Sequence, residues 1–171
     1  MELFTEVGFE DTTVARIAER GGLTERTFFR HFADKREVLF AGSTDLQDAL
    51  VGAVDAAPAD ATPMEVIALS LASTAAWFDG RRDYARARQQ VICSHPALTE
   101  RELIKMAHLA TALADALRRR GVPEPAASLA AEAGIAVFRV AFERWTAPKE
   151  KRELSEVITE SLEELRTVTS K

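Results

Sequence analysis

Residues 12–32 read T-T-V-A-R-I-A-E-R-G-G-L-T-E-R-T-F-F-R-H-F, and this stretch decides the fold of the first part of the chain. Apolar side chains recur at spacings of three and four on both sides of a Gly-Gly pair. This pattern predicts two short helices joined by a tight turn. Thr12 or Thr13 precedes the first helix and Thr24 the second, where a hydroxyl caps the first turn. The stretch is therefore typical of a helix-turn-helix.

The second helix of such a motif presents polar side chains that suit DNA. Its outward face would carry Glu25, Arg26, Thr27, Arg30 and His31, all able to hydrogen-bond in the major groove. Residues 12–36 contain six Lys and Arg against three Asp and Glu, although the whole chain has a net charge of −5. We expect a locally basic DNA-binding segment on an acidic protein. A merely packed helical hairpin is the alternative.

The run L-F-T-E-V-G-F-E-D-T-T-V-A-R-I-A-E-R-G-G-L-T-E-R-T-F-F-R-H-F-A-D-K-R-E-V-L, residues 3–39, resembles the N-terminal signature of the TetR family. The resemblance implies DNA contacts by Thr13, Thr24, Glu25, Arg26, Thr27, Phe29, Arg30, His31 and Lys35. Thr13 would hold a phosphate, Glu25 and Arg26 would read base edges, and Lys35 would clamp a phosphate.

Three of these positions carry alternatives. Phe29 stands where the family usually has tyrosine, and the missing hydroxyl-to-phosphate bond would cost about 1 kcal/mol. For two residues there is an alternative to a DNA contact. Arg30 would then be a solvated side chain, and His31 would pack against the following helix. The first helix is also short compared with the family, so either the sequence begins at an internal methionine or the protein lacks part of the support for its head.

The remaining residues predict further helices and no strands. Asp34 would cap one long helix that runs toward Val54 and links two modules, with a loop at 56–63. Further helices are expected at about 64–78, 83–93, 96–121, 125–145 and 151–168, divided by glycine and proline. We predict an all-α protein of about nine helices, with a three-helix DNA-binding domain at 1–44 and a ligand-binding and dimerisation domain at 45–171.

The second domain offers a candidate ligand pocket. I-C-S-H-P-A-L-T-E-R-E-L at 92–103 and A-F-E-R-W at 141–145 resemble an actinobacterial branch of the family, which implies apolar or acyl-CoA-like ligands. Arg88 falls on an otherwise inward face, so it needs an anionic partner, either Glu102 or a bound carboxylate or phosphate. Candidate pocket residues, each of which would equally serve a plain core, are Trp77, Phe78, Tyr84, Arg88, Met106, Leu109, Leu113, Phe138 and Phe142.

The last two helices predict a dimer. One is small or apolar around most of its circumference, and the other has an apolar seam at alternating spacings of four and three. The expected interface residues are Ala126, Ala130, Gly134, Val137, Ala141, Leu154, Ile158 and Leu165. A two-fold dimer would present two reading helices to a pseudo-palindromic operator.

Composition narrows the function classes. The chain has 47% hydrophobic and 29% charged residues, no apolar run long enough for a membrane helix and no signal-peptide pattern, so we expect a cytoplasmic protein. Its single cysteine, Cys93, is expected to be a small buried hydrophobe. No catalytic array, metal cluster or cofactor motif emerges, so an enzyme is not expected.

The sequence therefore favours a ligand-responsive repressor that binds DNA as a homodimer and is released by a small molecule. A ligand-binding helical dimer that has lost or weakened DNA binding is the alternative, favoured by Phe29 and the short first helix.

Overall fold

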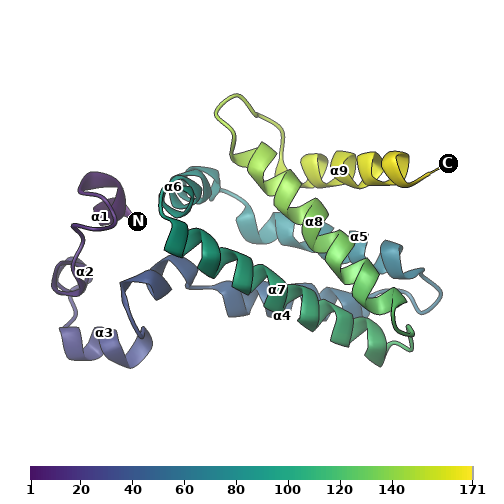
Figure 1. Ribbon diagram of the computed structural model, residues 1–171, viewed down its shortest axis with the longest axis horizontal. Helices are drawn as coiled ribbons and strands as arrows, with labels where there is room; N and C mark the ends of the chain where they lie inside the picture. The colour runs from purple at the N-terminus through teal and green to yellow at the C-terminus, as the bar shows by residue number, and fades with distance from the viewer. Residues whose placement is uncertain (171) are drawn as a thin grey trace.

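The computed structural model describes residues 1–170, and within them it is all-α, as predicted (Figure 1). The helices are α1 (Glu2–Glu6), α2 (Val14–Arg20), α3 (Glu25–His31), the 3-10 helix η1 (Lys35–Phe40), α4 (Ser43–Ala56), α5 (Pro63–Phe78), α6 (Arg82–Cys93), α7 (Pro96–Arg119), α8 (Ala126–Thr146) and α9 (Leu154–Thr169). None of them is long and apolar enough to cross a bilayer. Lys171, the last residue of the predicted second domain, lies outside the described residues.

The first three helices form a head at one end of the molecule (Figure 1). Thr13 and Thr24 cap α2 and α3, and their hydroxyls accept from the amides of Arg16 and Thr27. The turn between the two helices contains Gly22 at φ +65°, a left-handed conformation that glycine adopts without steric cost. The predicted helix-turn-helix is confirmed.

The predicted continuous helix from Asp34 to Val54 is wrong. Asp34 does cap a helix, accepting from the amides of Arg36 and Glu37, but that helix is the 3-10 segment η1. The chain then breaks at Gly42, whose φ is +83°, and α4 starts at the next residue. A Cβ at Gly42 would lie 3.1 Å from Cζ2 of Trp77, so both backbone conformation and packing favour glycine here.

Helices α4 to α9 form the body. Contacts connect α4 with α5 and α7, α8 with α5, α7 and α9, and α6 with α7 and α8. One large apolar core runs through all of them, and it includes the fully buried Leu50, Ile67, Leu71, Leu113 and Leu117. The boundaries of α5 to α9 agree with the expected ones to within about three residues, since glycine and proline mark most of the ends.

A second apolar cluster joins the head to the body. Phe4 and Phe9 from the head and Leu39 and Phe40 from η1 pack against Val91, Ile92 and Leu98 of α6 and α7. Ring centroids of Phe9 and His95 lie 5.1 Å apart at the same junction. The head is therefore docked on the body through buried side chains as well as through the chain connection.

The single cysteine differs from its prediction. Cys93, expected to be a small buried hydrophobe, is exposed at the end of α6. Its sulfur accepts from the side-chain amide of Gln89 at 3.4 Å. The apolar positions of this helix that do enter the core are Ala85, Val91 and Ile92.

Most of the residues predicted for the dimer interface are buried inside a single protomer. Gly134 faces α5, and a Cβ there would lie 2.5 Å from Cγ2 of Ile67. Of the other predicted positions, Ala130, Val137, Ala141, Leu154 and Ile158 are all buried in the same core. Only Ala126, which is exposed, and Leu165, which is half-buried, remain available for a partner. The small residues of α8 serve close helix packing within the chain.

We predict that Gly134→Ala destabilises the protein by about 1 to 3 kcal/mol, because the added methyl group overpacks the contact with Ile67. Gly52→Ala is the matched control, since Gly52 lies within α4 and a Cβ added there would meet no atom within 4 Å. That change should stabilise the helix by about 0.5 to 1 kcal/mol. Chemical denaturation of both variants checks the pair, and equal effects would contradict the packing argument.

Candidate nucleic-acid interface and ligand pocket

The outward face of α3 is polar and open to solvent. Glu25, Arg26, Arg30 and His31 are exposed. Thr27 is half-buried, and its backbone amide donates to the Thr24 hydroxyl. On the opposite side of α3, Phe28 is only 1% exposed and packs the helix into the head. The structure thus brings the predicted base-reading residues together on one surface.

Phe29 and His31 both face outward from the same helix. Phe29 is 54% exposed and stacks edge-on against Phe28 at a centroid distance of 5.4 Å. His31 is exposed, and its ring nitrogen lies 3.4 Å from the Arg30 guanidinium, so the alternative of a packed histidine is not supported. Both residues remain available to a partner molecule.

Several basic residues in this part of the chain form ion pairs with nearby carboxylates. Arg20 pairs with Glu2 and Glu6, and its hydrogen bond lowers the pKa of the Glu6 carboxyl. Arg36 pairs with Asp34 and likewise holds the pKa of that carboxyl below its ordinary value. Within residues 1–170, Arg16, Arg26 and Arg30 form no ion pair. Arg16, which is exposed on α2, was not among the predicted contacts.

Lys35 differs from its prediction. Its ammonium group donates to the carbonyl oxygens of Phe9, Glu10 and Thr12 at 2.7, 2.9 and 3.0 Å and lies 4.5 Å from the Phe9 ring centroid. A lysine ammonium has three N–H donors, so none is left for a phosphate in this arrangement. The predicted phosphate clamp is corrected to an internal tie that holds the loop before α2 against η1.

We predict that Lys35→Met lowers the free energy of unfolding by about 1 to 3 kcal/mol, because three carbonyl groups lose their donor. Amide hydrogen exchange should rise first in residues 1–13. The exposed Lys149, changed to Met, provides a control that should leave both measurements unaltered. Unchanged exchange in the head of the Lys35 variant would argue against the tie.

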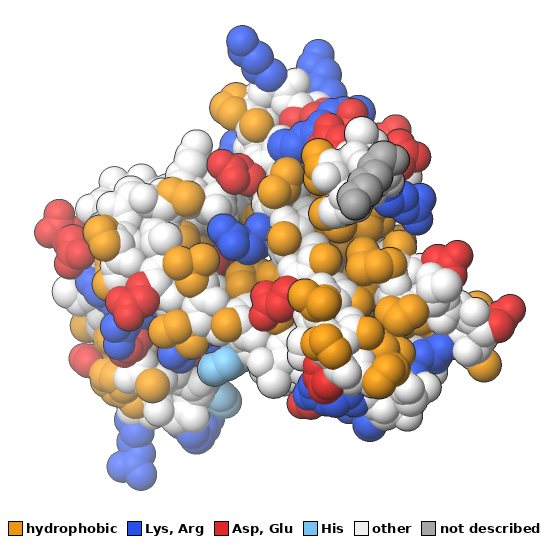
Figure 2. Space-filling model, turned by 45° about the vertical axis from the view of Figure 1, so that its right-hand side comes forward, with side chains coloured by type: hydrophobic (Ala, Val, Ile, Leu, Met, Phe, Trp, Pro, Cys, Tyr) orange, Lys and Arg blue, Asp and Glu red, His pale blue; other side chains and the backbone are white. Residues whose placement is uncertain are grey.

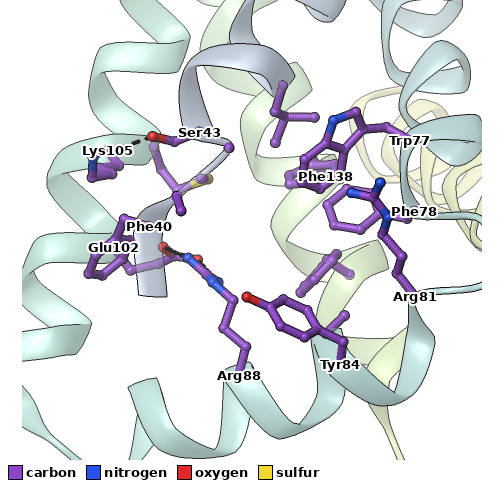
Figure 3. A pocket seen from close by; sticks show the side chains of 16 residues that line it. Phe40, Ser43, Trp77, Phe78, Arg81, Tyr84, Arg88, Glu102, Lys105 and Phe138 are labelled. Carbon is purple, nitrogen blue, oxygen red and sulfur yellow. Dashed lines mark hydrogen bonds and ion pairs between the residues drawn. The ribbon is translucent and has the colours of Figure 1, made fainter. Parts of the chain in front are cut away.

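A cavity of about 100 Å³ lies where η1, α4, α5, α6, α7 and α8 meet. Figure 3 shows its aromatic wall of Trp77, Phe78 and Phe138, with Arg88 and Glu102 on the opposite side. The full lining comprises Phe40, Ala41, Gly42, Ser43, Leu46, Trp77, Phe78, Arg81, Tyr84, Ala85, Arg88, Glu102, Lys105, Met106, Phe138 and Phe142.

Most of the predicted pocket residues line this one cavity. Trp77, Phe78, Tyr84, Arg88, Met106, Phe138 and Phe142 are all part of its wall. Leu109 and Leu113 are not, because both are buried in the body's core at 4% and 0% exposure. Sequence reasoning missed Phe40, residues 41–43, Arg81 and Lys105. The break at Gly42 brings this segment into the cavity wall and places Gly42 beside Trp77, and helical periodicity gave no signal of that break.

Arg88 is paired with Glu102 inside the protein, which is one of the two alternatives predicted for it. Its Nη1 and Nη2 donate to the two carboxylate oxygens of Glu102 at 3.1 and 2.9 Å. Its Nε donates to the carbonyl oxygen of Leu39 at 2.6 Å, and the guanidinium lies 5.2 Å from the Phe40 ring centroid. The two side chains are only 18% and 20% exposed. One guanidinium thus connects α6, α7 and η1.

Glu37 makes a second connection between η1 and α7. Its carboxylate lies 2.8 Å from Nη2 of Arg101 and 3.5 Å from Nζ of Lys105. The same Lys105 ammonium lies 3.4 Å from the Ser43 hydroxyl. Arg81, at the pocket mouth, stacks on Trp77 at 4.9 Å and has no ion-pair partner in the part of the chain that the structure describes. Two residues of the pocket wall, Arg88 and Lys105, therefore also make polar contacts with η1.

Comparison with known proteins identifies the family to which both parts of the chain are similar. The family model of bacterial regulatory proteins of the tetR family matches residues 1–41, and the model of the MftR C-terminal domain matches residues 61–170. The chain belongs to the TetR family. Proteins of this family are transcriptional regulators and not enzymes.

Similar proteins include other regulators of the TetR family. The HTH-type transcriptional regulator TcmR of Streptomyces glaucescens is 40% identical over 67 residues, which make up 39% of this chain and 30% of that protein. The crystal structure of PfmR from Thermus thermophilus has 25% identity and a TM-score of 0.54, covering 99% of this chain and 96% of its own. Thermus thermophilus FadR, solved in complex with lauroyl-CoA, has 22% identity and a TM-score of 0.61, with coverage of 100% and 91%. This last likeness shows the fold.

Proposed function

We propose that this TetR-family regulator represses transcription in the bacterial cytoplasm, binding an operator through α3 as a homodimer and leaving it when a small molecule occupies the body. The observation that carries the proposal is the exposed face of α3, where Arg26 and Arg30 have no acidic partner within residues 1–170. Glu25 and Arg26 read base edges, and Thr13, Arg30 and the newly found Arg16 contact phosphates. Thr24, Thr27, Phe29 and His31 contribute contacts around them.

We predict that Arg26→Ala weakens operator binding by about 1 to 3 kcal/mol and relaxes the base preference at one position, because a bidentate base contact is lost. Arg16→Ala should weaken binding to all sequences and reduce the salt slope by about 1. The measurement is fluorescence anisotropy with DNA selected by the full chain from a random duplex pool. Arg166→Ala, exposed on α9, is the control. Retention of full affinity and specificity by the Arg26 variant would refute the assigned reading role.

The dimer in this proposal uses the outward face of α8. Leu129 and Val140 are 66% and 50% exposed, and with the less bulky Ala133 and Ala136 they form a stripe at spacings of four, three and four. Ala126 and the half-buried Leu165 of α9 extend it. Figure 2, which turns the α9 end of the molecule toward the viewer, shows hydrophobic side chains gathered among charged ones on this face. An apolar stripe of this kind suits two-fold pairing.

We expect Leu129→Glu combined with Val140→Glu to convert the dimer to monomer, because four carboxylates would be placed in a small apolar interface. Sedimentation velocity measures the change. Leu103→Glu is the matched control, since Leu103 is 47% exposed on α7 and lies away from the stripe. If both variants behave alike, the stripe is not the interface.

The effector of the proposed repressor is an apolar or acyl-CoA-like molecule that binds in the cavity beside Trp77 and Phe138. The cavity supports this because six of its sixteen lining residues are aromatic and residues 40–43, which lead into the head, form one side. A ligand can release DNA only if it binds more tightly to the conformation in which the head is displaced.

A ligand-binding dimer with weakened DNA affinity is the second candidate. Two observations favour it: the ammonium of Lys35 is fully engaged by carbonyl oxygens, and Phe29 offers no hydroxyl. The duplex selection described above separates the two, because this candidate enriches no sequence. Phe29→Tyr should then raise affinity for duplex DNA by restoring the hydroxyl.

A further inference from the structure

Arg88 takes part both in the cavity and in the connection between head and body. It forms part of the cavity wall, and it is also an anchor of the head through its bond to the Leu39 carbonyl of η1. Its remaining contacts go to Glu102, which lines the same cavity. A molecule in the cavity that binds this guanidinium therefore acts directly on the connection between body and head.

The charge of the cavity favours an anion as that molecule. Its lining holds three cationic side chains, Arg81, Arg88 and Lys105, against the single carboxylate of Glu102. In Figure 3 the Tyr84 side chain lies beside Arg88 with its hydroxyl directed inward, and no partner for that hydroxyl is found within residues 1–170. An incoming carboxylate would meet a guanidinium and a phenol, which are donors suited to it. A cationic molecule would meet an excess of positive charge.

The size and walls of the cavity favour a compact apolar body on this anion. Its volume is about 100 Å³, and a dry cavity of roughly 150 Å³ holds benzene. The rings of Phe78, Phe138 and Phe142 lie within 5.1 to 6.2 Å of one another along one side. A small monocarboxylate, with its apolar part against these rings, matches both the charge and the space.

We propose that the effector is a small apolar monocarboxylate that takes the place of Glu102 on Arg88 and thereby detaches η1 from the body. This inference rests on the proposed ligand response of the repressor. The displaced Glu102 pairs with Lys105, three residues further along α7, a spacing that brings opposite charges together. Lys105 then leaves Glu37 and Ser43, which it contacts only at 3.5 and 3.4 Å. In this exchange η1 loses its Lys105 contact at Glu37, and α7 loses its contact with Ser43 at the start of α4.

The first test measures ligand preference without DNA. Isothermal titration of the full chain uses unbranched carboxylates from butanoate to decanoate and benzoate, each compared with its primary amide of the same shape. The expected result is that the tightest carboxylate binds at least about tenfold more tightly than its amide, since charge-assisted bonds to Arg88 are lost with the amide. Equal binding of every pair, or tighter binding of the amides, would overturn the proposal.

Two variants at opposite ends of the ion pair should have opposite effects. Glu102→Gln removes the competing carboxylate and should strengthen carboxylate binding several-fold, whereas Arg88→Met should weaken it at least about tenfold. Loss of folding cannot produce both signs. Arg86→Met is the matched control, because Arg86 lies on the same helix, donates to the Thr146 carbonyl at 2.9 Å and does not line the cavity. Weaker binding in both Glu102→Gln and Arg88→Met would contradict the exchange.

Hydrogen exchange tests the detachment of η1. Addition of the tightest carboxylate should speed amide exchange at residues 36–41, and Arg88→Met should show this fast exchange without ligand. Carboxylate binding that leaves these amides protected would refute the coupling. Because neither experiment contains DNA, a failure of operator selection would remove the proposed repressor function and leave these results standing. Normal operator binding without carboxylate preference would remove only the present inference.

Discussion

The relative positions of α6, α7 and η1 depend on the half-buried guanidinium of Arg88, which contacts all three segments. Removing it would leave the Glu102 carboxylate with no cation at hydrogen-bonding distance and the Leu39 carbonyl without its donor, at one site of low exposure. Unpaired buried charges are costly, so α6, α7 and η1 must keep their mutual positions while the pair is intact. The apolar cluster of Phe9, Leu39 and Ile92 adds non-directional attraction, and Arg88 adds the geometry.

This arrangement explains how a small cavity can matter to a distant surface. The helix α3 is attached to the body through α1 and the residues that follow it, through η1 and through the segment around Gly42. Phe4 and Phe9 pack against α6 and α7. Glu37 and Leu39 of η1 contact α7 and α6 through Arg101 and Arg88. Gly42 lies against Trp77 of α5. A change at the cavity wall therefore reaches the head through packed side chains and a few hydrogen bonds, with no need for a long helix as a lever.

Local features of the structure were predictable from sequence, and contacts between distant segments were less so. The helix-turn-helix depends on neighbours within about twenty residues, so its caps at Thr13 and Thr24 and its turn at Gly22 follow from short-range rules. The pairing of Arg88 with Glu102 was one of two options, because an inward-facing arginine requires an anion. The break at Gly42 was missed because one glycine inside an apolar helical pattern is compatible with a continuous helix. The ring of Trp77, which packs against Gly42 at the break, lies far along the chain.

The neighbours of α8 were misassigned for a similar reason. A helix that is apolar around most of its circumference needs several neighbours, but periodicity does not say whether a neighbour belongs to the same chain. Gly134 turned out to admit Ile67 of α5, and the outward stripe is the one that contains Leu129 and Val140. Lys35 shows the same limit for a charged residue, since a resemblance transfers its position but not the three carbonyl oxygens that surround it.

The cluster that joins head and body has a consequence for protein engineering. The two family models match residues 1–41 and 61–170, yet Phe4, Phe9, Leu39 and Phe40 of the first part are packed against Val91, Ile92 and Leu98 of the second. A chimaera that places this head on another body would expose or overpack those seven side chains unless the acceptor residues on α6 and α7 were transferred with it. The two parts are therefore matched partners, and specificity for an operator cannot be exchanged here by moving the first 44 residues alone.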